Sequence, residues 1–190
     1  MVGAMGELKT YERKRNFSVT PEPKPRKAKA TKKLRFVIQK HAASSLHYDL
    51  RLEAAGVMKS WAVPKGPSLN PADKRLAVPT EDHPISYNKF EGAIPKGEYG
   101  AGSVIVWDRG WYENLSDGSP ERAVRAGAIK FDLHGEKLQG KFSLRHVGSG
   151  RNWILVKMKD EHARRSGDVT KQRPESVVTG KTIEQIARGA

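Results

Sequence analysis

Apolar and polar residues alternate along the chain in many short runs, as in β-strands that bury one face. The clearest run, LHYDLRLE at 46–53, has Leu and Tyr on one face and His, Asp, Arg and Glu on the other. Further strands are predicted at 34–39, 57–63, 75–81, 102–108, 128–134, 140–147 and 152–158. Gly, Pro, Asn and Asp lie between these runs. This pattern predicts an all-β, mainly antiparallel protein, either a barrel or a sandwich.

Two short helices interrupt the strand pattern. The first is predicted at 120–126, with Ser119 as its N-cap, Pro120 at its first position and Gly127 as its stop. The second is predicted at 182–188. We divide the chain into a basic N-terminal arm at 1–33, a β-domain at 34–160 and a C-terminal tail at 161–190.

The N-terminal arm is basic and rich in proline, which is typical of a linker. We predict a disordered linker at 22–33 and a docked segment at 11–22, because the latter also contains Phe17 and Val19.

Composition narrows the classes of function. The 190 residues include no cysteine, so a disulfide framework, a thiolate metal site and a cysteine nucleophile are excluded. No apolar run approaches the ~20 residues of a membrane span, and the first residues, MVGAMGELKTYERKR, lack the apolar core of a signal peptide. We therefore expect a cytoplasmic protein without a membrane partner. A net charge of +14 favours nucleic acid as the partner.

The polar face of 46–53 has two interpretations. An ordinary solvated strand face is the simpler one, because buried charges require partners. The alternative is a metal site, since His47 and Asp49 leave the strand on one face and the small AASS bend can bring His41 beside them. Two imidazoles and one carboxylate leave coordination positions open and suit Mn²⁺, Fe²⁺ or Zn²⁺.

Several cationic residues add a possible phosphate site. Taken singly, Lys65, Arg75 and His83 are typical surface residues. Together with Arg51 they could bind a phosphate, because one guanidinium can donate two parallel hydrogen bonds to two phosphate oxygens. The glycine-containing loop at 94–104 is not interpreted as a phosphate loop. It lacks the P-loop spacing and leads into a predicted strand, not a helix.

Three longer segments resemble a known family. QKHAASSLHYDLRLE, SWAVPKGPS and PTEDHPISYNKFEGAIPKGEYGAGSVIVWDRGWYE are similar to the 3′-phosphoesterase domain of bacterial DNA ligase D and its stand-alone relatives. The likeness continues from YERKRNFSVTPEP near the start to RPESVVTGKTIEQIA near the end. The resemblance implies a closed β-barrel with an active-site groove on one side, belonging either to a stand-alone enzyme or to a domain of a longer one.

The resemblance also implies roles for individual residues. The metal ligands would be His41, His47 and Asp49, holding Mn²⁺ or, in its place, Co²⁺ or Zn²⁺. The catalytic residues would be Arg51, Glu81, His83 and Tyr87. The residues that bind phosphate or substrate would be Arg15, Glu22, Gln39, Lys65 and Arg75. The family usually has Arg-Asp-Phe where this chain has Arg15-Asn16-Phe17, which puts in question the role of that Asp.

The implied activity is the repair of 3′ ends in double-strand break joining. The family removes a terminal ribonucleoside from a primer and then the 3′-phosphate that remains, so the expected partners are a primer-template 3′ end and an end-joining ligase, polymerase or Ku. We expect a monomer associated with the nucleoid. Two alternatives stay open: a non-haem iron enzyme that adds His134 or His146 to a His-x-Asp pair, and a non-catalytic nucleic-acid-binding barrel.

Overall fold

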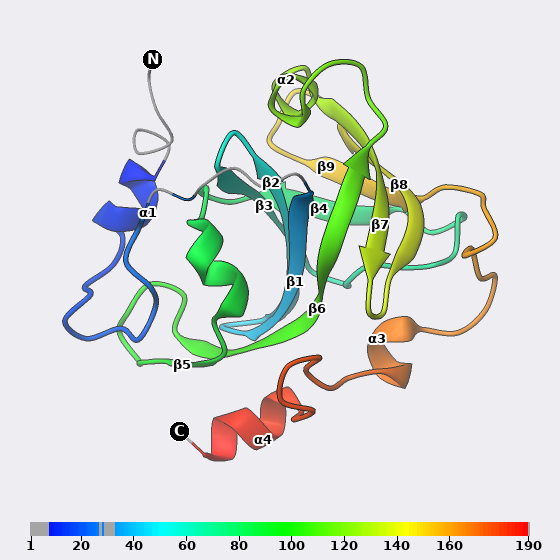
Figure 1. Cartoon of the computed structure of the whole chain (residues 1–190). Coiled ribbons are helices and arrows are strands. Elements are labelled where there is room, and N and C mark those ends of the chain that lie inside the picture. The colour runs from blue at the N-terminus through cyan, green and yellow to red at the C-terminus, as the bar shows by residue number, and fades with distance from the viewer. Residues whose placement is uncertain (1–7, 27, 29–32, 190) are drawn as a thin grey trace.

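The computed structural model describes residues 8–26, 28 and 33–189 (Figure 1). The linker predicted at 22–33 falls partly on positions 27 and 29–32, which lie outside the described residues. Within the described chain one antiparallel sheet dominates, as the alternating pattern predicts. Its strands are β1 (Leu34–Ala42), β2 (Leu46–Ala54), β3 (Val57–Val63), β4 (Arg75–Pro79), β5 (Gly92–Ile94), β6 (Gly102–Asn114), β7 (Ala128–Gly135), β8 (Gln139–His146) and β9 (Trp153–Lys157).

The sheet closes on itself. Its strand order is β1-β2-β3-β4-β9-β8-β7-β6-β5, and β1 also pairs with β6. The strands from β1 to β4 and from β6 to β9 therefore form a barrel, while β5 is an additional strand on the free side of β6. The closed β-barrel is confirmed and the sandwich is excluded.

Both predicted helices are present. Ser119 accepts a hydrogen bond from Arg122 N to cap α2 (Pro120–Arg125), and Thr182 forms a capping box at α4 (Ile183–Arg188). Three short helices were not predicted, because each is only one turn long and shows no helical period. They are α1 (Lys9–Arg13), the 3₁₀ helix η1 (Ile85–Lys89) and α3 (Val169–Gln172).

Strand β6 is longer than predicted. The prediction ended this strand at Asp108 before an Arg-Gly pair, but the strand continues to Asn114 and pairs with β7 from Gly110 onward. A Cβ on Gly110 would lie 2.1 Å from the carbonyl oxygen of His134. This glycine therefore permits a close approach of two strands and does not mark a turn.

The inner face of the barrel is apolar. Tyr48, Leu50 and Leu52 of β2 point inward and pack with Trp61 of β3 and Trp107 of β6, among other side chains of the main core cluster. Burial of such side chains stabilises the fold by roughly 1.5–3 kcal/mol each. The apolar half of the alternating pattern is therefore the barrel interior.

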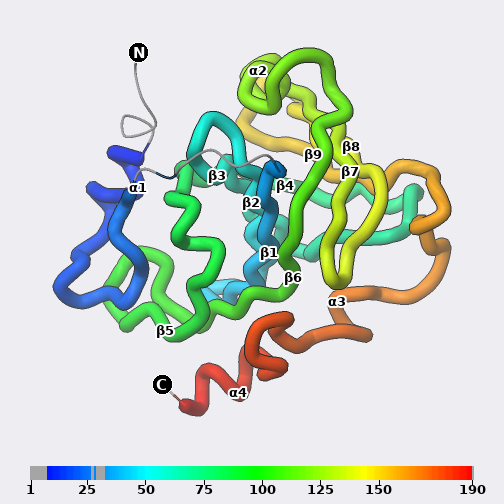
Figure 2. Tube along the Cα trace, in the orientation of Figure 1, coloured from blue at the N-terminus to red at the C-terminus, as the bar shows by residue number. Residues whose placement is uncertain are grey.

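The outer face of β1–β3 is covered as well. Val37 and Met58 point outward and pack with Ile85 of η1, while Tyr87 of η1 packs with Tyr11 of α1. Figures 1 and 2 show η1, α1 and β5 on the same side of β1. Asp49 and Arg51 on this outer face are 5% and 3% exposed. The interpretation as a solvated strand face is thus wrong, because η1 and the N-terminal segment cover this part of the barrel.

The C-terminal segment also lies against the barrel. Trp107 Nε1 donates to Arg173 O at 2.7 Å, and Val177 N donates to Val106 O at 3.0 Å. Ile183 of α4 is buried. None of the helices in the described ranges is long and apolar enough to cross a membrane.

Candidate metal and phosphate site

A pocket of about 300 Å³ opens on the outer face of β1–β3. The polar face of β2 supplies its central residues, and the N-terminal segment, the stretch before η1 and the loop before β6 supply the others. The lining includes nine of the predicted site residues, namely Arg15, Glu22, His41, His47, Asp49, Arg51, Glu81, His83 and Tyr87.

The predicted metal ligands meet at one end of this pocket. His41 and His47 are direct partners in the β1–β2 pairing, so their side chains leave the same face. Asp49 Oδ2 lies 3.7 Å from His41 Nδ1, and Asp49 Oδ1 lies 3.6 Å from His47 Nε2. One ligand atom from each of the three residues falls within 4.8 Å of the others. The hairpin register therefore brings together residues that are six positions apart in sequence.

Backbone carbonyls orient both imidazoles. His41 Nε2 donates to Gly100 O at 2.7 Å, and His47 Nδ1 donates to Ser45 O at 3.0 Å, since a carbonyl can only accept. The other ring nitrogens, His41 Nδ1 and His47 Nε2, lie 3.7 and 3.6 Å from the Asp49 carboxylate and are unprotonated when the rings are neutral. Metal-binding histidines are usually held by such a second hydrogen bond. The donor set and its orientation therefore fit a divalent ion.

Asp49 is ionised in this environment. Burial by itself raises the pKa of this carboxyl, but Arg51 and the two imidazoles outweigh burial and hold the pKa well below its usual value. Burial likewise opposes protonation of His47, yet the Asp49 carboxylate and the Ser45 carbonyl raise the pKa of this imidazole. The charged carboxylate is the form that binds a cation.

Arg51 connects the metal ligands to the rest of the pocket. Its Nη2 donates to Asp49 Oδ2 at 3.2 Å and its Nε donates to Gln39 Oε1 at 2.7 Å. Gln39 is fully buried and donates to the carbonyls of Tyr87 and Phe90, so its amide orientation is fixed by η1. The guanidinium is thereby held rigidly beside the carboxylate.

His83 lies between two guanidinium groups. Its Nδ1 donates to Glu81 O at 2.8 Å and lies 3.0 Å from Arg51 Nη1, and its Nε2 accepts from Arg15 Nη2 at 3.3 Å. Burial, then Arg51 and Arg15, lower the pKa of His83 well below its usual value. The imidazole is therefore neutral in the free protein.

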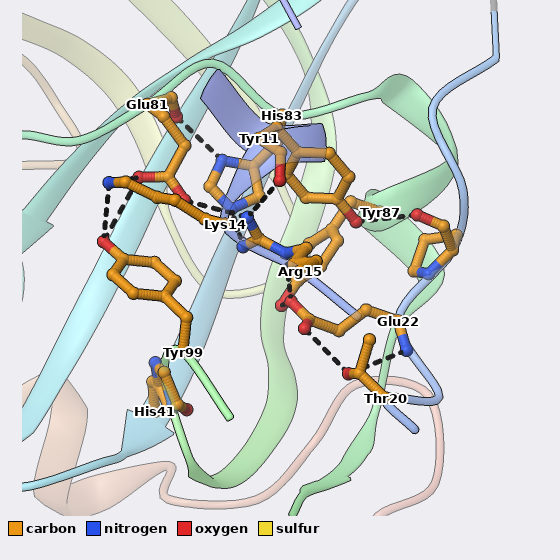
Figure 3. Close-up of polar contacts among 12 residues, drawn as sticks. Tyr11, Lys14, Arg15, Thr20, Glu22, His41, Glu81, His83, Tyr87 and Tyr99 are labelled. Carbon is orange, nitrogen blue, oxygen red and sulfur yellow. Dashed lines mark hydrogen bonds and ion pairs between the residues drawn. The ribbon is translucent and has the colours of Figure 1, made fainter. Parts of the chain in front are cut away.

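Arg15 and Glu22 of the N-terminal segment line one side of the pocket. Figure 3 shows their polar contacts with residues around His83. Arg15 Nε donates to Glu22 Oε1 at 2.9 Å, and Arg15 Nη1 donates to Glu81 Oε1 at 3.0 Å. Tyr87 Oη also donates to Glu22 Oε1, at 2.8 Å. Arg15, Glu22 and Glu81 side chains are at most 4% exposed. Residues distant in sequence thus form one connected network around His83.

Asn16 does not take part in this network. It is exposed, and its Oδ1 accepts from Ser18 Oγ at 2.6 Å and from Ser18 N at 3.2 Å. Such a local turn needs an acceptor oxygen, which Asn and Asp both supply. The exchange from the family's usual Asp therefore leaves the turn intact.

Sequence reasoning missed three residues that line the pocket, Thr80, Tyr99 and Gly100, and the neighbouring Lys14. Lys14 Nζ donates to Glu81 Oε2 and to Tyr99 Oη, at 3.1 and 3.0 Å, so the N-terminal segment and the loop before β6 meet across the pocket. Gly100 holds His41, and Thr80 Oγ1 is buried without a hydrogen-bond partner in the described chain. The one signal in the sequence is that Tyr99 and Gly100 belong to the PKGEYG segment and Thr80 belongs to the PTEDHP segment.

Lys65 and Arg75 lie elsewhere. They line a separate pocket together with Lys40 and Tyr48, which point to the inner side of the barrel wall. His134 and His146 are also absent from the metal pocket: His134 stacks on Trp111, and His146 Nε2 donates to Gly150 O. A facial triad built with either of these two histidines is therefore excluded.

The fold and the pocket together define a class: a closed antiparallel barrel whose outer face carries a buried His-His-Asp cluster beside paired guanidiniums. Residues 39–146 match the family model described as the DNA ligase D 3′-phosphoesterase domain. The chain belongs to this family.

Curated relatives agree with the family match. Over 183 residues the chain is 52% identical to the multifunctional non-homologous end joining protein LigD of Pseudomonas aeruginosa, which covers 93% of this chain and 22% of the relative. It is 47% identical over 167 residues to the LigD of Mycolicibacterium smegmatis, which corresponds to 85% of this chain and 22% of the relative. It is 44% identical over 157 residues to the LigD of Mycobacterium tuberculosis, which corresponds to 81% of this chain and 20% of the relative. The chain thus spans about a fifth of the length of these relatives.

Proposed function

We propose that this protein is a metal-dependent 3′-phosphoesterase that trims the 3′ ends of nucleic acid during double-strand break repair. It removes a 3′-terminal ribonucleoside by phosphodiester cleavage and then removes the remaining 3′-phosphate. The observation that carries this proposal is the cluster of His41, His47 and Asp49, whose ligand atoms lie within 4.8 Å of one another, with Arg51 Nη2 3.2 Å from Asp49 Oδ2. The family and the names of the relatives support the repair setting.

The three ligands would hold one Mn²⁺, with Co²⁺ or Zn²⁺ as substitutes. A bound divalent ion neutralises charge on a phosphate oxygen and acts as a Lewis acid. The carboxylate suits Mn²⁺, and two imidazoles with one carboxylate leave positions free for water and substrate.

Arg51 would bind the scissile phosphate. Within the described residues the only hydrogen-bond partner of its Nη1 is His83, whereas its Nε and Nη2 are held by Gln39 and Asp49. A guanidinium fixed in this way stabilises the negative charge that develops in the transition state without having to reorganise. Thr80 Oγ1, a buried hydroxyl without a partner among the described residues, would donate to the same phosphate.

His83 would act as a proton donor only once the substrate is bound. In the free protein burial, together with the two guanidiniums, lowers the pKa of His83 and keeps its imidazole neutral. A phosphate placed between them offsets their charge, so the pKa of His83 rises on binding and its Nε2 can carry a proton to the leaving oxygen. Glu81 would hold Arg15 in place directly, and Tyr87 would do so through Glu22.

The test is an assay with two primer-templates, one ending in a 3′ ribonucleotide and one in a 3′-phosphate. We expect both to be processed with Mn²⁺ and neither to be processed in chelator. Full turnover in chelator, with no metal detected in the protein, would refute the metal-dependent mechanism. Binding of both substrates without any turnover under all metals would favour the non-catalytic nucleic-acid-binding barrel.

We further propose a cytoplasmic monomer that works with an end-joining ligase, polymerase or Ku.

A further inference from the structure

A second pocket, of about 520 Å³, lies at the mouth of the barrel, where Lys40 and Tyr48 face inward. Lys40 and His41 are consecutive in β1, so their side chains leave opposite faces of the same strand. The mouth pocket and the metal pocket are therefore separated by the end of the β1–β2 hairpin. Four cations, Lys40, Lys65, Arg75 and Lys171, line the mouth pocket with one carboxylate, Asp168.

Lys40 is the unusual residue of this pocket. It is only 6% exposed and occupies an inward position between Ile38 and Ala42. Among the described residues its ammonium has no hydrogen-bond acceptor and no ion-pair partner within 4.0 Å. Glu184 of α4 interacts electrostatically with Lys40, but the two side chains do not form an ion pair. The stem of Lys40 is therefore buried while its ammonium opens into the pocket without an acceptor from the described chain, a position in which a bound anion can supply one.

Two other cations of the pocket have free donors as well, whereas Lys171 lies 3.8 Å from Asp168 Oδ2. Arg75 Nε is buried and has no partner in the described chain, although Arg75 Nη2 donates to Asp73 at 2.9 Å. Lys65 is exposed and likewise lacks a partner there. The carboxylate of Asp168, in contrast, is engaged by Thr170 N and Thr170 Oγ1 at 3.0 and 2.6 Å. The free donors therefore outnumber the free acceptors.

The wall of the pocket is built by close packing. Gly66, next to Lys65, has a φ of +71°, and a Cβ at this position would lie 2.8 Å from Thr170 Cγ2 and 2.9 Å from the Tyr48 ring. The absence of a side chain at this left-handed position lets the loop after β3 pass against the C-terminal segment. Lys65 is thereby held next to Tyr48 and Thr170, which line the same pocket.

We propose that the mouth pocket binds a backbone phosphate of the nucleic-acid strand whose 3′ end lies in the metal pocket. The ligand chemistry is a phosphate, because three ammonium groups and a guanidinium line the pocket with one carboxylate. The strand is the favoured source, since it carries a phosphate at every nucleotide and can pass the end of the hairpin from one pocket to the other. This inference rests on the proposed function only for the position of the 3′ end.

The test compares Lys40→Met with Lys130→Met, which removes an exposed lysine of β7 outside both pockets. Binding of a labelled primer-template is measured by fluorescence anisotropy in chelator at several salt concentrations. We expect Lys40→Met to weaken binding about tenfold at about 0.1 M salt and to lower the slope of log K against log salt by about one, as for one lost phosphate contact. Lys130→Met should change the slope by much less.

The same slope for Lys40→Met and the wild type would overturn the proposal. Because no turnover is needed, this outcome is independent of whether the protein is an enzyme. Met keeps the length of the lysine stem, and thermal unfolding checks that the variant folds. If it does not, Lys65→Met at an exposed position carries the same expectation and the same refutation.

A titration with inorganic phosphate separates the two sources of the ligand. If the pocket serves a free phosphate compound, inorganic phosphate will bind the wild type and not Lys40→Met, while binding of the primer-template stays unchanged. That combination would refute the assignment to the strand. Competition between inorganic phosphate and the primer-template, lost in Lys40→Met, would support it.

Discussion

In the middle of β2 the two faces of the strand are similarly buried but held in different ways. Leu50 and Leu52 on the inner face are 2% and 0% exposed, and Asp49 and Arg51 on the outer face are 5% and 3% exposed. The inner residues lie among apolar side chains that need only the right volume. The outer residues depend on oriented partners from other segments, such as Gln39. Similar burial therefore has different consequences: substitutions on the inner face act on stability, and substitutions on the outer face act on chemistry.

The strongest test of this difference is His47→Ala. We expect loss of both the diesterase and the monoesterase activity by at least about 1000-fold, because the loss of several kcal/mol of transition-state stabilisation by a metal corresponds to such a factor. The fold should remain, since Asp49 keeps its contact with Arg51. Turnover and Mn²⁺ binding by calorimetry check this prediction. His134→Ala, on β7 and outside the pocket, is the matched control and should retain both.

Leu50→Ala is the corresponding test on the inner face. We expect a loss of about 2–5 kcal/mol in the free energy of unfolding, because a cavity remains in the barrel core. The remaining folded protein should keep its Mn²⁺ affinity. Leu76→Ala on β4 is the control, since Leu76 is 39% exposed, and should cost less than about 0.5 kcal/mol. Chemical denaturation measures both values. Equal losses for the two variants would contradict the assignment of the inner face as the core.

The sequence predicts these two faces unequally well. Period-two alternation is a local signal, so the strand around Leu50 and the caps at Ser119 and Thr182 could be predicted directly. The burial of Arg51 could not be predicted from alternation, because η1 is one turn long and the N-terminal segment is separated from β2 by more than twenty residues. From its charge alone, Arg51 was therefore expected to be exposed to solvent.

The candidate site was found only in part for the same reason. The spacing of His41, His47 and Asp49 gave a cluster that the hairpin register brings together. The clamp of Arg51 with Lys65 and Arg75 rested on charge, without knowledge of which wall each side chain faces, and the structure places the latter two in the mouth pocket. The charge of these side chains indicates the class of ligand they bind. Which of them can bind the same ligand depends on the side of the barrel wall that each one faces.

Deletion of residues 1–22 removes partners of the outer face without changing the barrel strands. We expect turnover of the 3′ ribonucleotide primer at saturating substrate to fall by about 10- to 100-fold, the range seen when groups that orient a site are lost. Arg15 and Glu22 then no longer hold His83 and Tyr87. Deletion of residues 1–7 alone should leave turnover unchanged. If the longer deletion weakens only the apparent affinity, the segment is merely a basic linker.

The smallest expected effect is that of Asn16→Asp. If the aspartate usual in the family acted through a cation of the pocket, restoring it would raise turnover well above the wild-type value. In the structure Asn16 is exposed and its oxygen accepts from Ser18, in a turn that Asp forms equally well. We therefore expect a change in turnover of less than about twofold, as for surface substitutions that leave their hydrogen bonds intact. Steady-state kinetics on both primers measures it, with Arg15→Gln as the contrasting variant, which should lose activity because it unpairs the buried Glu22. A tenfold gain for Asn16→Asp would show that the outer-face network extends to this turn.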